Sequence, residues 1–355
     1  MKKFLALLLT LITIMSLCLV ACTKPDNNND DANDTEEEIV EIETPNVRGK
    51  TDVVYTDNKD GTIYFGMYPQ TKVTDQTLLT KLNEKIGTLP TANALGLWTA
   101  HDFVNANNYF EDYPDFSFFL DVKEDGAYYR AIYVTEYRLY NPLSSSTTSY
   151  QKSNGYEINT VYWFKYEPIL WQVLTTKQDG SRLLFSDMAI DTIAFDNDGY
   201  CENYYATSTS RKFLTESFLN YAFTPAEIAM IPTVEVDNSA KSTGELSNSY
   251  ATDNTFDKVF MPSVYELTEP SYGFNLYANQ EDAKRSKKIT DYGISQGAVT
   301  YTRENGKMPT SLCTRSPHTY ARRFFFISPK GVCSSYDACA LFGLAPMLYI
   351  KTNTD

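Results

Sequence analysis

Cysteine and histidine are the residue types in this chain that could support redox, metal or nucleophilic chemistry. Two of the six cysteines, Cys18 and Cys22, lie near the N-terminus. The other four are the candidate disulfide partners Cys201, Cys313, Cys333 and Cys339. No C-x-x-C spacing occurs among them, so neither a zinc knuckle nor a thioredoxin-type motif is predicted. Four cysteines allow three pairings, and the sequence does not choose among them.

The segment from Cys333 to Cys339 is the one stretch whose spacing could carry redox chemistry. In an extended strand their Cα atoms would lie about 20 Å apart. A disulfide needs these atoms within about 7 Å, so a turn through residues 334–337 would be required. A structural disulfide, to each other or to Cys201 or Cys313, is favoured over redox chemistry.

The histidines do not form an evident catalytic group. A Ser-His-Asp triad needs a histidine base, and the chain contains only His101 and His318. Arg322 and Arg323 follow His318 closely, and neighbouring cations make a base harder to protonate. No pair of acidic residues is set apart as a glycosidase dyad either. No catalytic residue is therefore assigned.

The candidate ligand-binding residues lie in and after the segment Thr314-Arg315-Ser316-Pro317. They are Arg315, His318 and Tyr320. Arg315 would either anchor a ligand or tie its own loop to a carboxylate, and the structural role is favoured.

A calcium loop begins, in outline, at Asp196-Asn197-Asp198-Gly199. An EF-hand needs glycine at its sixth position and glutamate at its twelfth. Those positions are Cys201 and Thr207, so the EF-hand motif fails. No metal site and no cofactor are predicted, and calcium held in another kind of loop is the alternative.

Residues 1–21 are predicted to be a lipoprotein signal peptide. Lys2 and Lys3 precede an apolar run that is too short to span a bilayer as a mature helix. The segment Leu19-Val20-Ala21-Cys22 resembles the lipobox of bacterial lipoproteins. That resemblance implies a diacylglyceryl group on Cys22 and a position at the extracytoplasmic face of a bacterial membrane. An ordinary secretory signal is the alternative.

Residues 22–51 are predicted to be a disordered acidic tether. Residues 24–48 contain nine acidic residues and only two basic ones, Lys24 and Arg48, with almost no apolar pattern. The whole chain has a formal net charge of -14. Because an acidic surface repels phosphate, nucleic acid is not an expected partner. Attachment to the membrane must come from the lipid on Cys22.

Residues 52–355 are predicted to form a single α+β domain of mostly antiparallel strands with short helices. The expected strands are residues 62–70, 116–122, 127–140, 161–164, 169–175, 182–186, 258–261, 324–328, 331–336 and 344–350. Helices are expected at residues 74–86 and 210–221, and after the capping box Thr224-Pro225-Ala226-Glu227. Strands and helices do not alternate regularly, which argues against a doubly wound sheet.

Eight segments in a fixed order carry a resemblance to a known family. They are residues 64–71, 162–174, 183–187, 210–214, 222–224, 257–263, 314–317 and 343–348. In order and spacing they resemble the bacterial extracytoplasmic family called domain of unknown function 6273. The resemblance covers nearly all of the chain after residue 60 and makes residues 72–160 an extension within the domain. The family pattern is similar to C-type-lectin-like folds, including the branch of formylglycine-generating enzymes.

A non-enzymatic binding or adhesion module is the favoured function, with a glycan or a surface protein as ligand. The acidic tether, the 27 tyrosines and the lack of a catalytic group support this interpretation. The alternative is a copper-dependent oxidase or hydroxylase related to the formylglycine-generating enzymes, with Cys333 and Cys339 as its metal ligands. A solute-binding lipoprotein would need a two-lobed α/β fold, which the strand pattern does not predict.

Overall fold

The computed structural model describes residues 47–101, 115–142, 144, 148–197, 200–301 and 309–352. These residues fall within one compact unit. The predicted signal peptide, Cys22 and most of the predicted tether lie outside the described residues. Within the described ranges, no helix combines the length and the apolarity needed to cross a membrane.

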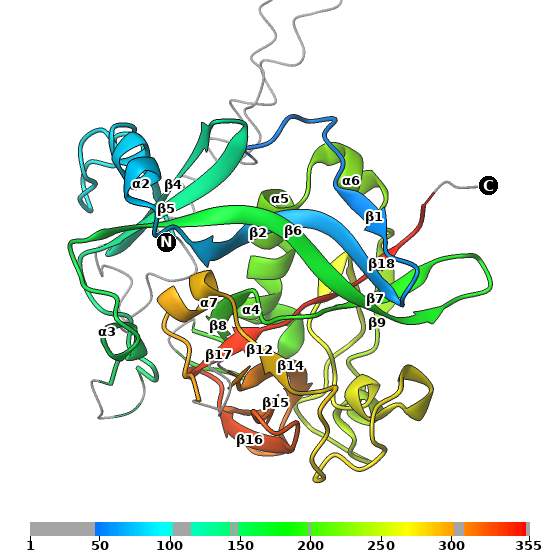
Figure 1. The fold of residues 1–355 in the computed structure, drawn as a ribbon. Helices are drawn as coiled ribbons and strands as arrows, with labels where there is room; N and C mark the ends of the chain where they lie inside the picture. Colours follow the sequence, from blue (N-terminus) through cyan, green and yellow to red (C-terminus); the bar gives the residue numbers. More distant parts are fainter. Residues whose placement is uncertain are drawn as a thin grey trace, which may run out of the picture. The chain divides into compact units, whose positions relative to one another are not determined.

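A large antiparallel sheet forms the frame of the described chain (Figure 1). Its central path runs in the order β11-β18-β7-β6-β5-β4-β3, while β2 pairs with β6 and β1 pairs with β2. The strands are β1 (Tyr55–Asp57), β2 (Thr62–Lys72), β3 (Thr99–Ala100), β4 (Ser117–Glu124), β5 (Ala127–Val134), β6 (Val161–Thr176), β7 (Arg182–Ser186), β11 (Val259–Phe260) and β18 (Met347–Ile350).

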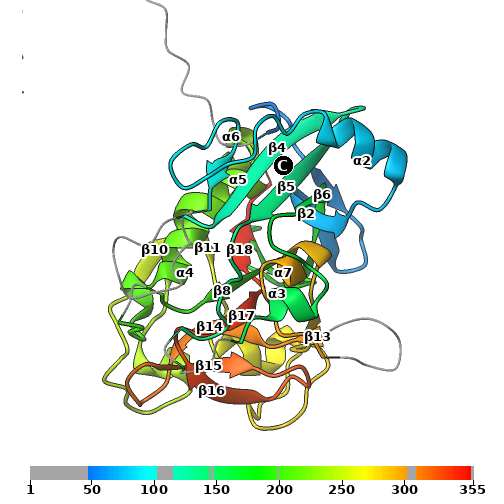
Figure 2. The same ribbon diagram turned by 90° about the vertical axis from the view of Figure 1, so that its left-hand side faces the viewer.

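A second sheet has the order β16-β15-β14-β17-β8 and contains one parallel pair, β14 with β17. Its strands are β8 (Asp191–Ala194), β14 (Leu312–Pro317), β15 (Arg323–Ile327), β16 (Cys333–Asp337) and β17 (Leu341–Leu344). Two small ribbons complete the strands. They are β9 (Val234–Val236) with β10 (Thr255–Asp257), and β12 (Lys287–Lys288) with β13 (Pro309–Thr310). The second sheet lies at the opposite end of the domain from β4 and β5 (Figure 2).

The helices are short, as the α+β prediction requires. The α-helices are α2 (Gln76–Asn83), α3 (Tyr150–Ser153), α4 (Thr209–Lys212), α5 (Leu219–Ala222), α6 (Pro225–Ala229) and α7 (Asp291–Ser295). A π-helical segment, Phe213–Phe218, joins α4 to α5 into one continuous helix. Single 3₁₀ turns are Tyr205–Thr207, Ala240–Thr243, Glu266–Thr268 and Pro270–Tyr272. The described chain is thus a sheet-rich α+β fold with open antiparallel sheets.

The continuous helix of residues 209–222 packs against β2, and Gly66 allows the close approach (Figure 1). Gly66 has a φ of +68°, and a Cβ atom there would lie 2.4 Å from the Phe223 ring. Phe223 also stacks on Trp171 of β6, with ring centroids 6.4 Å apart. Because Gly66 has no side chain, the helix end and the sheet share one aromatic core.

Strand β6 corrects the prediction of two separate strands at residues 161–164 and 169–175. It continues through Pro168. Proline is tolerated within a strand where it faces an unpaired edge. Both β5 and β7 pair with the edge of β6 that lies opposite β2, at residues 161–165 and 171–176. Among the described residues, no strand pairs with this edge at residues 166–169.

Local side-chain and turn contacts explain where several of these elements begin or end. The side chain of Asp75 caps α2 by accepting a hydrogen bond from the Leu78 backbone N–H at 2.7 Å. The Asp125-Gly126 turn joins β4 to β5 with positive φ at both residues. The capping box of α6 is present, formed by Thr224 and Glu227.

Arg48, which precedes the predicted domain boundary at residue 52, packs against the domain. Arg48 is 4% exposed, and its guanidinium lies 2.5 Å from the buried carboxylate of Glu227. It also donates a hydrogen bond to the Ala222 carbonyl at 2.8 Å. Arg48, which lies in the predicted tether, thus contacts residues that are far away in the sequence.

The predicted extension at residues 72–160 contributes strands to the large sheet. Its β4 and β5 continue that sheet beyond β6. A small separate core lies beside them, formed by Leu82, Trp98, Phe118, Tyr129, Ala131, Tyr133 and Trp163. Trp163 is only 1% exposed and donates its indole N–H to Asn83 at 2.9 Å. The extension is therefore fastened to the rest of the domain through β6.

Candidate functional site

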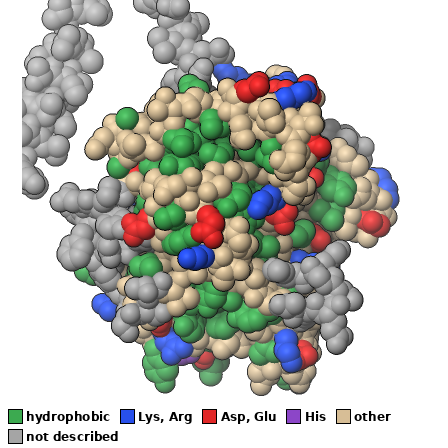
Figure 3. Space-filling model, turned by 60° about the vertical axis from the view of Figure 1, so that its left-hand side comes forward, with side chains coloured by type: hydrophobic (Ala, Val, Ile, Leu, Met, Phe, Trp, Pro, Cys, Tyr) green, Lys and Arg blue, Asp and Glu red, His purple; other side chains and the backbone are tan. Residues whose placement is uncertain are grey.

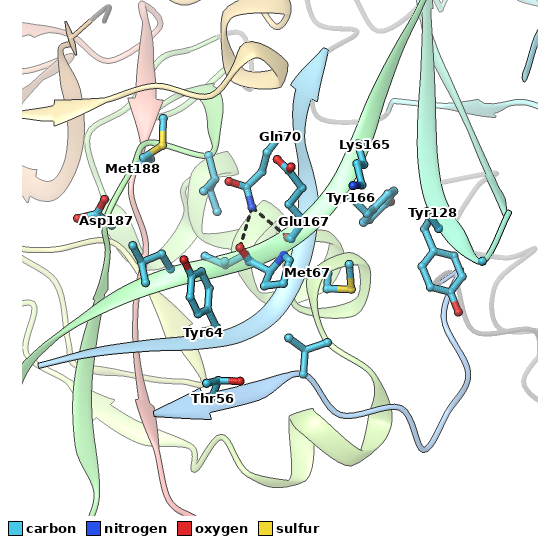
Figure 4. Close-up of a pocket in the computed structure, with 17 residues that line it drawn as sticks. Thr56, Tyr64, Met67, Gln70, Tyr128, Lys165, Tyr166, Glu167, Asp187 and Met188 are labelled. Carbon is cyan, nitrogen blue, oxygen red and sulfur yellow. Dashed lines mark hydrogen bonds between the residues drawn. The ribbon is translucent and has the colours of Figure 1, made fainter. Parts of the chain in front are cut away.

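A groove with a volume of about 800 Å³ crosses β2 and β6 (Figure 4). It opens where β5 and β7 diverge along one edge of β6. Tyr129 still pairs with Lys165 on the β5 side, and the Leu170 carbonyl accepts the Asp187 N–H on the β7 side. The sheet leaves a gap between these two points, and the groove occupies this region.

Aromatic, thioether and polar side chains line the groove together. Tyr128 lies at one end, and Asp187 and Met188 lie at the other, with Tyr64 and Met67 between them (Figure 4). Tyr64 is 37% exposed, so its ring is available to a ligand.

Gln70 and Glu167 give the groove its fixed polar groups. The Gln70 amide donates to the backbone carbonyls of Glu167 and Pro168 at 3.0 and 3.1 Å (Figure 4). The Glu167 carboxylate accepts a hydrogen bond from the Thr71 hydroxyl at 2.6 Å. These contacts hold both side chains in one orientation, as a binding surface with defined hydrogen-bond partners requires.

A second hollow of about 710 Å³ adjoins the groove, and Asp187 and Met188 line both. Gln172 lines only the second hollow, and its amide donates to Asp187 Oδ1 at 2.7 Å. Lys287 also lines this hollow. We call this space, bounded by Gln172, Asp187 and residues 283–289, the lysine hollow.

Lys287 has an unusual environment for a cationic side chain. It is 2% exposed, its ammonium group has no hydrogen-bond partner, and Nζ lies 4.1 Å from the centroid of the Phe185 ring. Burial lowers the pKa of Lys287 to about 8, and the Asp187 carboxylate opposes this shift. Strongly shifted groups beside a hollow are typical of functional sites.

A buried charged cluster lies under the groove and holds the extension in place. Arg130 of β5 binds both oxygens of Asp121 in β4, at 2.8 and 2.6 Å. Tyr166, which lines the groove, donates its hydroxyl to the same carboxylate at 2.9 Å. His101 is buried nearby, and burial together with the positive charges of Arg130 and Arg138 lowers its pKa. His101 is therefore neutral at pH 7.

A second buried carboxylate, Asp191, lies close to this cluster. It accepts the Tyr68 hydroxyl at 2.6 Å and the Thr192 N–H at 2.7 Å. Burial raises the pKa of Asp191 to about 6, although these hydrogen bonds oppose the shift.

The predicted ligand-binding residues Arg315, His318 and Tyr320 do not line the groove or the lysine hollow. Arg315 is 3% exposed and forms a two-fold ion pair with Glu266, with N–O distances of 2.5 and 3.1 Å. It therefore ties its strand to a carboxylate. The His318 ring contacts the rings of Tyr320 and Phe325 in tilted arrangements, and Tyr320 is 67% exposed.

The cysteines form one disulfide among the described residues, between Cys201 and Cys339. Cys313 and Cys333 remain thiols. Burial raises the pKa of Cys333 to about 12, which disfavours the reactive thiolate. The alternative with a Cys333–Cys339 copper pair is wrong for this structure, because the sulfur of Cys339 is bonded to Cys201.

No group of three or more potential metal-ligating side chains occurs within the described residues. The candidate calcium loop is described only in part, because residues 198 and 199 lie outside the described ranges. Asp196 in this loop accepts hydrogen bonds from the Thr209 N–H and hydroxyl, at 2.9 and 2.7 Å. This carboxylate thus orients the start of α4.

The lysine hollow was not anticipated, although the sequence contains a signal for it. Residues 284–288 read Lys-Arg-Ser-Lys-Lys in a strongly acidic chain. Such a run is usually solvated, yet Arg285 and Lys287 are buried.

On the face shown in Figure 3, acidic and basic side chains lie side by side with hydrophobic ones between them. The net charge therefore does not describe the local surface.

Comparison with known proteins gives one family match. Residues 179–352 match the family model described as Domain of unknown function (DUF6273). No curated protein and no solved structure matches the chain. The matched range contains Asp187 and Lys287, while the whole of β2 and of β6 precedes it. Because β6 pairs with β7, the strands before residue 179 and the matched range build one sheet.

Proposed function

Because residues 179–352 belong to the family described as domain of unknown function 6273, whose description assigns no activity, we propose a function from the site itself. The chain is a surface lipoprotein whose folded part binds a glycan in the groove over β2 and β6. It acts as a non-enzymatic binding or adhesion module.

The groove's combination of aromatic and fixed polar groups is the observation that carries this proposal. A sugar ring has an apolar C–H face and a rim of hydroxyl groups. Tyr64 and Tyr128 offer rings for the apolar face, at low entropic cost for a side chain of this size. Gln70 and Glu167 have fixed orientations beside them and can exchange hydrogen bonds with hydroxyl groups.

Anchoring through Cys22 is the second part of the proposal. The lipobox-like segment Leu19–Cys22 and the acidic run before Arg48 support it. One diacylglyceryl group supplies the two acyl chains that stable anchoring requires. The folded part would then face the outside of the cell, where envelope glycans are available as ligands.

The fold itself is proposed to be C-type-lectin-like, on the basis of the family resemblance. The mixed five-stranded sheet and the short helices are compatible with this assignment. Superposition of an experimentally determined structure on lectin-like domains would test it, and failure to align β14 to β17 would reject it.

A glycan array probed with the full-length chain tests the proposed function. We expect binding to a restricted set of glycans, and loss of that binding in the variants Tyr64→Ala and Tyr128→Ala. Tyr320→Ala is the matched control, because it removes an exposed tyrosine outside the groove.

Two results would contradict the proposal. Silence across the whole array, with correctly folded protein, would exclude a glycan and favour a surface protein as ligand. Binding that survives both groove substitutions but is lost in Tyr320→Ala would move the site to the region of His318.

A further inference from the structure

The lysine hollow gathers unpaired positive charge in an otherwise acidic protein. Lys284, Lys287 and Lys288 all line it. Within the described chain, none of these three ammonium groups lies within ion-pair distance of a carboxylate. Arg285, between them in sequence, points elsewhere and donates to the carbonyls of Tyr277 and Gln280. The basic run thus supplies three lysines to one concave surface.

The buried lysine interacts with Asp187, which lines both the lysine hollow and the groove. Gln172 and Phe185 are directly paired across β6 and β7, so their side chains project from the same face of the sheet. Asp187 is two residues beyond Phe185 and projects from that face as well. The Lys287 ammonium lies over the Phe185 ring, and its charge interacts with the Asp187 carboxylate.

We propose that the lysine hollow binds an anionic group, a carboxylate or a phosphate, with the Lys287 ammonium as its main counter-ion. A buried cation without an acceptor is unfavourable, and an incoming oxyanion would supply the missing acceptor. This inference rests on the proposed function for one feature only, namely that the anionic group belongs to a saccharide lying in the adjoining groove.

The arrangement also gives the anionic group a defined position. Gln172 holds the Asp187 carboxylate by the hydrogen bond to Oδ1. Asp291 also lines the hollow, and its carboxylate is engaged by the Lys72 backbone N–H at 2.9 Å. The two acidic residues are thus held by protein donors, whereas Lys284, Lys287 and Lys288 have no carboxylate within ion-pair distance in the described chain. An anion is the ligand class that this charge pattern favours.

Binding should depend on pH in the range where Lys287 titrates. The charged groups that face the anion are Asp187, Asp291, Lys284, Lys287 and Lys288. Burial lowers the pKa of Lys287 to about 8. Affinity for an anion should therefore be highest below this pH and should fall as the ammonium loses its proton above it.

The test is a titration of the full-length chain, observed through the amine resonances of its lysines by NMR. The probes are galacturonate, inorganic phosphate and galactose. We expect galacturonate or phosphate to shift the Lys287 resonance and to raise the pKa of its amine. Galactose should leave both unchanged. A response to galacturonate alone would identify a carboxylate as the anionic group, and a response to phosphate alone would identify a phosphate.

Lys287→Met and the matched control Lys212→Met, an exposed lysine of α4, complete the design. We expect Lys287→Met to lower the affinity for the preferred anion at least about tenfold and Lys212→Met to leave it unchanged. An unchanged Lys287 resonance with both anions, or equal affinities of the two variants, would overturn the inference. Lys287→Met could also lose its preference for anionic over neutral ligands and still bind a neutral glycan. That result would support the lysine hollow as an anion site independently of the groove.

Discussion

The Gln172 amide donates a 2.7 Å hydrogen bond to Asp187 Oδ1, and this contact joins β6 to the end of β7 at the wall between two hollows. Asp187 lines both the groove and the lysine hollow. A substitution at Asp187 should therefore change both the pKa of Lys287 in the lysine hollow and the affinity of the groove for its ligand.

Replacing Asp187 by asparagine should lower the pKa of Lys287 further. Burial holds that pKa at about 8 against the opposing effect of the Asp187 carboxylate. Asp187→Asn keeps the size of the side chain and removes its charge. The measurement is an NMR titration of the Lys287 amine, with Asp291→Asn as control in the same hollow. Equal pKa changes in the two variants would show that Asp187 has no particular influence.

Lys287→Met should change how stability depends on pH. In the unfolded chain the lysine keeps its proton up to its ordinary pKa of 10.5, whereas in the folded chain it loses it near 8. The unfolded state binds more protons between these values, so wild-type stability rises with pH relative to Lys287→Met. Over the whole interval the free energy of unfolding of the wild type gains roughly 3–4 kcal/mol relative to Lys287→Met.

Urea unfolding at about pH 7.5 and about pH 9.5 measures this effect. We expect Lys287→Met to be more stable than wild type at the lower pH, because it removes a buried unpaired charge. Its advantage should shrink at the higher pH. A constant difference between the two proteins would mean that the amine of Lys287 titrates normally.

Gly66→Ala should destabilise the fold by about 2–4 kcal/mol. The new Cβ atom would lie 2.4 Å from the Phe223 ring and 2.9 Å from the Ala222 carbonyl oxygen. Gly61 is the matched control, because it also has positive φ but nothing within 4 Å of its Cβ position. Gly61→Ala should cost about 1 kcal/mol. Chemical unfolding of both variants measures these costs. Equal losses of unfolding free energy in the two variants would show that the contact with Phe223 does not set the requirement for glycine at residue 66.

Removal of the Cys201–Cys339 disulfide should cost about 2–5 kcal/mol. The bond links residues 138 positions apart, so it restricts a long loop of the unfolded chain. Peptide mapping by mass spectrometry without reduction should recover these two cysteines as one linked pair. Recovery of a Cys333–Cys339 pair instead would contradict the structure.

Lipid attachment at Cys22 should decide where the protein is found. We expect the mature N-terminal peptide to begin at Cys22 and to carry the mass of acyl chains. Cys22→Ala should abolish this modification, whereas Cys18→Ala should leave it intact. An unmodified mature protein recovered from the medium would reject the anchor.

Local chemistry made part of the fold predictable from the sequence. The Asp75 cap, the Asp125-Gly126 turn and the capping box at Thr224 depend only on neighbouring residues, and all three are present. Pro168 misled the strand assignment because its tolerance depends on which edge of β6 is unpaired. That edge is set by β5 and β7, which pair with β6 from distant parts of the sequence.

The candidate site was less predictable than the fold. Arg315 could be expected to serve a structural role, but its partner Glu266 could not be identified from spacing alone. Lys287 belongs to a basic run that normally indicates a solvated segment. Its burial follows from the pairing of β12 with β13 and from contact with Phe185. Neither relationship leaves a local pattern in the sequence.

The most direct test of the central claim is the affinity of the best array ligand for wild type and for Tyr64→Ala, measured by titration calorimetry. Truncating a contacting aromatic side chain typically costs more than 1 kcal/mol of binding free energy. We therefore predict about a tenfold or larger loss of affinity in Tyr64→Ala and an unchanged affinity in Tyr320→Ala. Equal affinities of wild type and Tyr64→Ala, with a loss in Tyr320→Ala, would contradict the groove as the binding site.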